Sequence, residues 1–189
     1  MSEYYNITLN FATRCDMPAP VVAVLTALAN GTVPAKADLA TLPMLIAHYL
    51  GHPSNAGPVN EGGAAWRFTP IGWPRPDEKP GDATHLLHME RVFQDDELAN
   101  AGIHFVHWLF QFALDGHLGV ELPPDAAPPT LYVRQGDDLV TTYLGFAPDT
   151  SGAATATPKT LIVVEQTLRQ PLAKAIQAAI DWNPEAMFD

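Results

Sequence analysis

A strand-then-helix unit occurs twice in this chain of 189 residues. Residues 5–12 and 84–91 both have the composition of a strand, and each leads through acidic residues into an apolar helix that ends near a glycine. We expect these helices at about 18–30 and 96–114. Two such units predict an α+β fold: a two-layer sandwich with a mainly antiparallel sheet and the helices on one face, in a ferredoxin-like arrangement.

The first strand has the clearest pattern in the chain. Large apolar and polar residues alternate strictly from Tyr5 to Phe11. Because successive side chains of a strand point to opposite faces, this alternation predicts one buried and one polar face. We expect the core to contain apolar residues of both units: Ile7, Leu9, Phe11, Val22, Leu25, Phe105, Leu109 and Phe112.

Turn and cap signals divide the remaining chain. Asp16 is positioned to cap the first helix, and Pro18 lies near its first turn. Segments 52–63 and 70–81, rich in Gly and Pro, read as loops. Five further elements are expected in chain order: a helix over 38–50, strands over 66–69 and 118–122, and a hairpin whose strands cover 131–134 and 139–144.

The whole chain, residues 1–189, is expected to form a single domain. Its core covers 1–145, and a flexible stretch rich in Gly, Ala, Thr and Pro follows over 145–159. A C-terminal appendage over 160–189 contains a strand at 161–165 and a helix at 171–182. So short a piece could not fold alone, so we expect it to dock on the same domain.

Composition and net charge limit the classes of molecule that this protein is expected to bind. Apolar residues make up 47% of the chain and charged residues only 16%, which favours a packed globule. The net charge of −11 repels nucleic acid and anionic membranes, and the ten Lys and Arg residues are scattered. There is no apolar run of membrane-spanning length and no signal-like start. These features predict a cytoplasmic protein that binds neither nucleic acid nor membrane.

Two segments carry a resemblance to a known group of proteins. One is a strand ending in Arg-x-Asp-x-Pro that runs into Val-x-x-x-Leu-x-x-Leu, and the other is Phe-x-x-Trp-Leu in the second helix. The matching residues are Arg14, Asp16, Pro18, Val21, Leu25, Leu28, Phe105, Trp108 and Leu109. With these motifs the chain resembles small bacterial proteins of unknown function with a duplicated strand–helix layout. The resemblance implies the fold and no catalytic residue.

Signatures of common enzymes are absent from the sequence. There is no Gly-x-Ser-x-Gly elbow, no Gly-x-x-x-x-Gly-Lys phosphate loop and no Gly-x-Gly-x-x-Gly turn. The one cysteine, Cys15, excludes an internal disulfide. It lies beside Arg14 before a helix, where its thiol could be activated, but it equally fits a small residue at the exit of a strand. No base can be assigned to it.

Histidines form two His-x-x-His pairs. His85 and His88 lie on a strand, where residues three apart point to opposite faces and could not share a metal. His104 and His107 lie on a helix, where they are neighbours and could. A metal site would need further ligands, with His88, Glu90 or His117 as candidates. The alternative is that both histidines belong to a solvated stripe, and we expect no metal and no cofactor.

The polar face of the sheet is the most plausible functional surface. Asn6, Thr8 and Asn10 should point away from the helices, with His88 and Glu90 beside them and Arg67 in reach. Water, a partner or the chain's own tail could cover this face.

Two classes of function follow from this surface. The first is a non-catalytic bacterial protein of immunity, accessory or regulatory type that binds a more basic protein. The second is a small enzyme or ligand-binding or metal-binding protein that combines the polar face with the histidine pairs, using His88, Glu90, His104 and His107. The missing catalytic motifs favour the first.

Overall fold

The computed structural model describes residues 3–52, 63–71, 83–124, 127–147 and 161–183. Its helices and strands follow in chain order: β1 (Tyr4–Arg14), α1 (Ala19–Ala29), α2 (Lys36–Leu39), α3 (Met44–Gly51), β2 (Ala64–Pro70), β3 (Ala83–Gln94), α4 (Asp95–Glu97), the π-helical turn η3 (Leu98–Gly102), α5 (Ile103–Phe110), β4 (Gly116–Leu122), β5 (Thr130–Gln135), β6 (Asp138–Ala147), β7 (Leu161–Pro171) and α6 (Leu172–Ile180).

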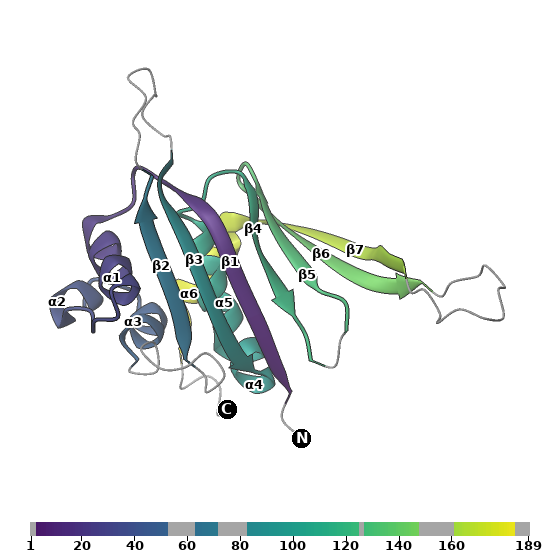
Figure 1. The fold of residues 1–189 in the computed structure, drawn as a ribbon, viewed down its shortest axis with the longest axis horizontal. Helices are drawn as coiled ribbons and strands as arrows, with labels where there is room; N and C mark the ends of the chain where they lie inside the picture. The colour runs from purple at the N-terminus through teal and green to yellow at the C-terminus, as the bar shows by residue number, and fades with distance from the viewer. Residues whose placement is uncertain (1–2, 53–62, 72–82, 125–126, 148–160, 184–189) are drawn as a thin grey trace, which may run out of the picture.

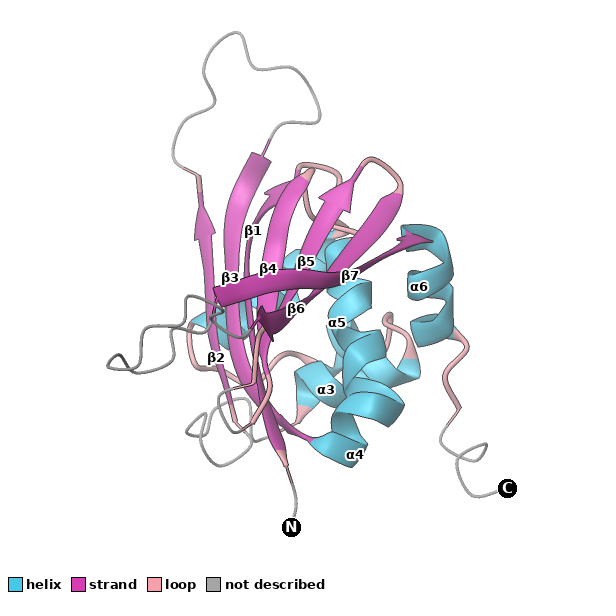
Figure 2. Ribbon diagram, turned by 90° about the vertical axis from the view of Figure 1, so that its right-hand side faces the viewer, coloured by secondary structure: helices cyan, strands magenta, loops and turns pink. Residues whose placement is uncertain are grey.

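Seven strands form one open sheet in the order β2-β3-β1-β4-β5-β6-β7. Every neighbouring pair is antiparallel. Figure 1 shows β1, β2 and β3 in front of α5 and α6, and the view turned by 90° in Figure 2 shows the helices as a second layer beside the sheet. The predicted α+β fold, with an antiparallel sheet and helices on one face, is confirmed.

β1 lies inside the sheet, between β3 and β4, and its alternating sequence explains its position. Ile7 and Leu9 are fully buried under the helices, and Phe11 is nearly so. Gly119 on β4 lies against this strand, and a Cβ atom there would come within 2.5 Å of the Thr8 carbonyl oxygen. The alternation predicted from the sequence therefore sets which face of the sheet receives the helices.

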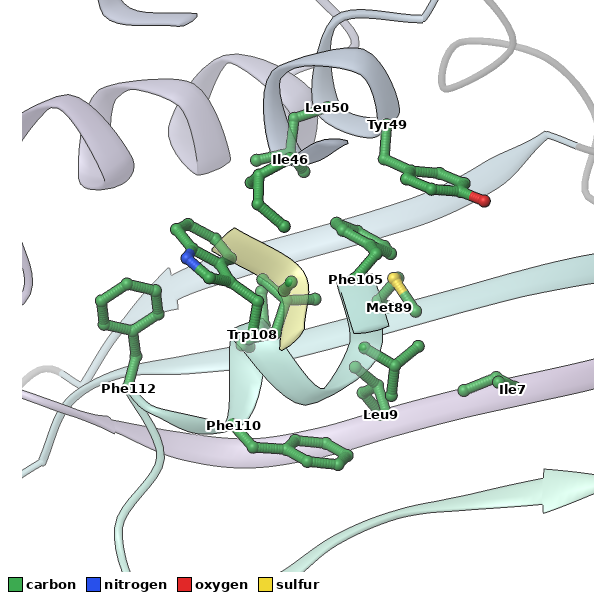
Figure 3. Close-up of a cluster of buried hydrophobic side chains, with 14 of the residues drawn as sticks. Ile7, Leu9, Ile46, Tyr49, Leu50, Met89, Phe105, Trp108, Phe110 and Phe112 are labelled. Carbon is green, nitrogen blue, oxygen red and sulfur yellow. The ribbon is translucent and has the colours of Figure 1, made fainter. Parts of the chain in front are cut away.

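Aromatic side chains of α5 fill the space between the two layers (Figure 3). Phe105 stacks on Tyr49 of α3, with ring centroids 4.8 Å apart, and Trp66 of β2 meets Phe105 edge-on. Seven of the eight predicted core residues are buried, while Val22 is half-buried and packs against their edge. The predicted core is therefore confirmed in its main part.

Two predictions about the first helices are wrong. The helix expected over 38–50 is divided into α2 and α3, because Pro43 disfavours helical backbone at Leu42 and begins the next helix as its N-cap. Asp16 does not cap α1, whose N-cap is Pro18 with no side-chain cap. Asp16 instead forms an ion pair with Arg14.

The second long helix is also shorter than expected. It runs through α4 and the π turn η3 into α5 and ends at Phe110, not at 114. Arg134 of β5 donates to the carbonyl oxygens of Gln111 and Ala113 at 3.1 and 2.7 Å, which satisfies the end of the helix. Leu114 then donates its backbone N–H to Ala12 on β1. The last predicted helical residues thus extend along the sheet.

The C-terminal segment contributes to both layers. β7 pairs with β6 along its whole length and forms one edge of the sheet, and α6 packs on α5. The strand expected over 161–165 continues to Pro171. The hairpin between β5 and β6 is confirmed, with Gly136 at φ +62° in its turn. Most of the stretch predicted to be flexible, over 145–159, lies outside the described residues, although β6 includes its first three positions.

Candidate functional site

The face of the sheet opposite the helices, called the open face below, carries six of the predicted site residues: Asn6, Thr8, Asn10, Arg67, His88 and Glu90. Arg67, His88 and Asn10 are direct cross-strand partners on β2, β3 and β1. Thr8 lies opposite Glu90 in the next row. Figure 1 looks onto this face, and the described helices lie behind it.

Hydrogen bonding within the open face is incomplete. The Asn6 side-chain amide donates to a Glu90 carboxylate oxygen at 3.3 Å. The Asn6 Oδ1 atom is buried and accepts no hydrogen bond from the described residues. Two apolar side chains flank the polar group, Leu86 with 50% and Leu122 with 44% of its surface exposed. The face therefore offers both polar and apolar contact area.

The strand histidine pair is split as predicted. His85 lies on the helix side, where its ring stacks on Phe68 at 4.2 Å between centroids, and burial lowers its pKa. His88 lies on the open face opposite Asn10. The two imidazoles therefore cannot bind one metal ion.

The helix pair, His104 and His107, lies in the other layer of the molecule. The sheet separates both residues from His88 and Glu90, so the structure does not bring these four residues together. The expected solvated stripe is wrong at His107, which is only 9% exposed and whose ring packs against Phe110 and against Tyr132 of β5. Burial, with a smaller contribution from His104, lowers the pKa of His107 to about 4.

Beside His107 is a cavity that the sequence did not predict, called the helix-side pocket below. Its volume is about 260 Å³. It lies between α5 and the strands β5, β6 and β7, and its lining includes Ile103, His107, Tyr132, Thr141, Tyr143 and Leu168. The aromatic residues of the pocket wall are visible in the sequence. No sequence pattern indicates that β7 pairs with β6 and so closes the pocket.

Tyr132 connects this pocket to a half-buried carboxylate, that of Glu121. Its hydroxyl group donates to Glu121, and its ring contacts that of His107 with centroids 6.2 Å apart. Burial raises the pKa of Tyr132 and that of Glu121. Burial therefore favours the protonated form of both groups, while the hydrogen bond from Tyr132 favours the ionised form of Glu121.

A larger cavity of about 550 Å³ lies where the end of β1 meets α6. Three of its charged residues are already engaged, since Arg14 pairs with Asp16 and Arg134 binds backbone carbonyls. Cys15 is exposed next to that ion pair. Neither this cavity nor the helix-side pocket is lined by a residue of the open face.

Two searches of the described residues bear on metal and membrane binding. Among these residues, no three His, Cys, Asp or Glu side chains are grouped as a metal site would need. No helix in the same part of the chain has the length and apolar character to cross a membrane.

Comparison of the chain with protein-family models, curated proteins and solved structures finds no match. The resemblance to small bacterial proteins therefore stays a prediction, as does the cytoplasmic location.

Proposed function

We propose that this protein acts by binding another protein through its open face, as an immunity-type, accessory or regulatory protein without catalysis of its own. One observation carries this proposal: a row of polar side chains crosses β2, β3 and β1 on a face that no described helix covers. Leu86 and Leu122 add exposed apolar area at its margins. Such a mixture of polar and apolar surface is typical of interfaces between proteins that also exist apart.

The partner is expected to be basic. The chain carries a net charge of −11, which attracts a positively charged protein from a distance. At close range, the Glu90 carboxylate can accept hydrogen bonds from Lys, Arg or backbone N–H groups of the partner. Arg67 at the edge of the row offers donors in return, which would help to set the orientation of the complex.

A catalytic role for the open face has less support. The acid–base candidates are divided between two layers, with His88 and Glu90 on one side of the sheet and His107 on the other. No cavity described above encloses His88 or Glu90. Because catalysis usually needs convergent groups in a concave site, binding is the better account of this face.

We also infer a ferredoxin-like arrangement for the first part of the sheet. The chain order β1, helices, β2, β3, helices, β4 and the antiparallel spatial order β2-β3-β1-β4 support this inference. On this reading β5, β6 and β7 extend the sheet at the β4 edge. The open face would then be the sheet surface that such sandwiches leave uncovered.

The proposal can be tested by affinity capture from the native host with two matched variants. Asn10→Trp places a large ring in the middle of the open face, and Ala23→Trp places the same ring on the exposed side of α1. At low salt we expect the wild type and Ala23→Trp to recover the same basic protein and Asn10→Trp to lose it.

Two results would contradict the proposal. One is equal recovery of the partner by both tryptophan variants, which would place the interface elsewhere. The other is recovery of no partner at low salt, together with turnover in a broad hydrolase and oxidoreductase screen, which would favour an enzyme.

A further inference from the structure

Polar side chains of two buried residues line the helix-side pocket. His107 is 9% exposed and Thr141 is 8% exposed, and both line the pocket. Among the described residues, the His107 ring contacts the rings of Phe110 and Tyr132, and neither His107 nor Thr141 forms a side-chain hydrogen bond. Both groups can therefore form hydrogen bonds with a molecule that enters the pocket.

The pocket walls restrict the chemistry of that molecule. Ile103 and Leu168 contribute aliphatic surface, and the rings of Tyr132 and Tyr143 contribute aromatic surface. The cationic side chain of the described lining, Arg169, donates to Asp138 at 3.0 Å and to Gln135 at 2.6 Å, and Asp138 neutralises its charge. The described residues of the pocket lining therefore present no unpaired charge to a charged ligand.

His107 presents both hydrogen-bonding functions at neutral pH. Burial keeps its imidazole uncharged, and a neutral imidazole has one donor and one acceptor nitrogen. The Thr141 hydroxyl group can also donate or accept. Together they suit a ligand with a hydroxyl, amide or indole N–H group.

Volume sets the size of the ligand. A dry engineered cavity of about 150 Å³ binds benzene, and this pocket measures about 260 Å³. It has room for one ring with a substituent or for a fused pair of small rings, and it is smaller than the pockets of most drug-sized ligands.

We propose that the helix-side pocket is a binding site for a small uncharged aromatic molecule bearing one polar group, which contacts His107 and Thr141. This function is separate from binding of a protein by the open face, since the two surfaces lie on opposite sides of the sheet.

The test is an NMR titration of the full chain with p-cresol and indole. Benzoate and benzylamine serve as charged probes of similar size. We expect saturable shifts of the His107 ring and Thr141 methyl signals with the two uncharged probes, and at least tenfold weaker binding of the charged ones. Absence of shifts up to the solubility limit of p-cresol and indole, or tighter binding of benzoate, would overturn the proposal.

Variants locate the site. Thr141→Val removes one hydroxyl group at nearly constant volume and should weaken p-cresol binding about threefold to tenfold, as expected for one lost hydrogen bond. Thr142→Val makes the same change on the other face of β6 and should leave the affinity unchanged.

Leu168→Trp, at a rim position that is 45% exposed, should block the pocket without disturbing the core, whereas Ile162→Trp farther along β7 should not. An equal loss of affinity in both members of either pair would refute the assignment.

Discussion

The His107 imidazole is enclosed by α5, by Tyr132 of β5 and by the residues of β6 and β7 that line the pocket. Among the described residues, the charged or titratable groups around it are His104 on α5, Tyr132 with its partner Glu121, Tyr143, and Arg169, which forms an ion pair with Asp138. None of these supplies a negative charge in direct contact with His107. Protonation of this ring in the folded protein is therefore unfavourable.

This arrangement predicts an acid-sensitive fold. The pKa of His107 is about 4 in the folded chain against an ordinary value of 6.5, so between these values the unfolded chain binds a proton that the folded chain does not. The free energy of unfolding should fall as the pH drops from about 6.5 to 4, by about 3 kcal/mol from this residue. The raised pKa of Glu121 acts in the opposite direction.

Denaturation across pH 7 to 4 in two variants measures the His107 contribution. His107→Phe should flatten the dependence, while His48→Phe on the exposed side of α3 should retain it. A wild-type slope that survives in His107→Phe would show that another group is responsible.

A second residue-scale prediction concerns Leu25 of α1, which is fully buried. Leu25→Ala removes methyl groups and leaves a cavity, and should lower the free energy of unfolding by about 2–5 kcal/mol. Val22→Ala, one turn away at a half-buried position, should cost clearly less. Urea denaturation measures both, and equal losses would contradict the packing of α1 described above.

At the scale of elements, local sequence patterns predict most of the helices and strands. They do not predict the contacts that the C-terminal elements β7 and α6 make with the rest of the molecule. The alternation in β1 identified both the core residues and the open face, because the strand period sorts side chains between two faces. The single helix predicted over 38–50 is interrupted before Pro43. The apolar pattern of this segment continues through the proline, so the pattern alone does not show the break. The sequence predicts that the last strand ends at Glu165, because Gln166 and Thr167 interrupt the apolar run. In the structure β7 continues past this point, where a bulge shifts its register with β6.

The helix-side pocket was missed for the same reason. Its wall needs Thr141 and Leu168 to meet across β6 and β7, a pairing that no local sequence pattern specifies. The sequence predicts a solvated stripe that includes His107, because no local pattern shows which elements pack on α5. The grouping of the open-face residues follows from the two-residue period of a strand alone. The sequence therefore predicts that they share a face.

The junction of α5 with the sheet gives an element-scale prediction. Arg134 is buried and donates to the carbonyl oxygens of Gln111, Ala113 and Gly136. Arg134→Met keeps much of the volume but leaves these acceptors unsatisfied, and should destabilise the fold by about 3 kcal/mol.

Arg169→Met is the control, because it removes an exposed ion pair worth about 0–1 kcal/mol. Thermal or urea denaturation compares the two variants. A similar small decrease in the free energy of unfolding in both variants would mean that Arg134 does not stabilise the end of α5.

The whole molecule presents a strongly negative surface with one sheet face left open by its described helices. If a basic partner docks there, long-range attraction should speed association, and salt should weaken it. The Debye length falls from about 10 Å at 0.1 M to about 3 Å at 1 M ionic strength, which removes most of this attraction. The association rate should fall steeply over that range while the dissociation rate changes less.

Stopped-flow or surface-based kinetics with the captured partner measure this dependence. A salt-independent association rate would contradict an electrostatic account of partner choice.

The central claim is that the open face is the protein-binding surface, and an NMR map of the complex tests it most directly. Titration of the labelled chain with its captured partner should shift the signals of Asn6, Asn10 and His88 most. Signals of α1 and of the helix-side pocket should change little. Shifts concentrated on α1 or around His107, with the open face unchanged, would contradict the claim.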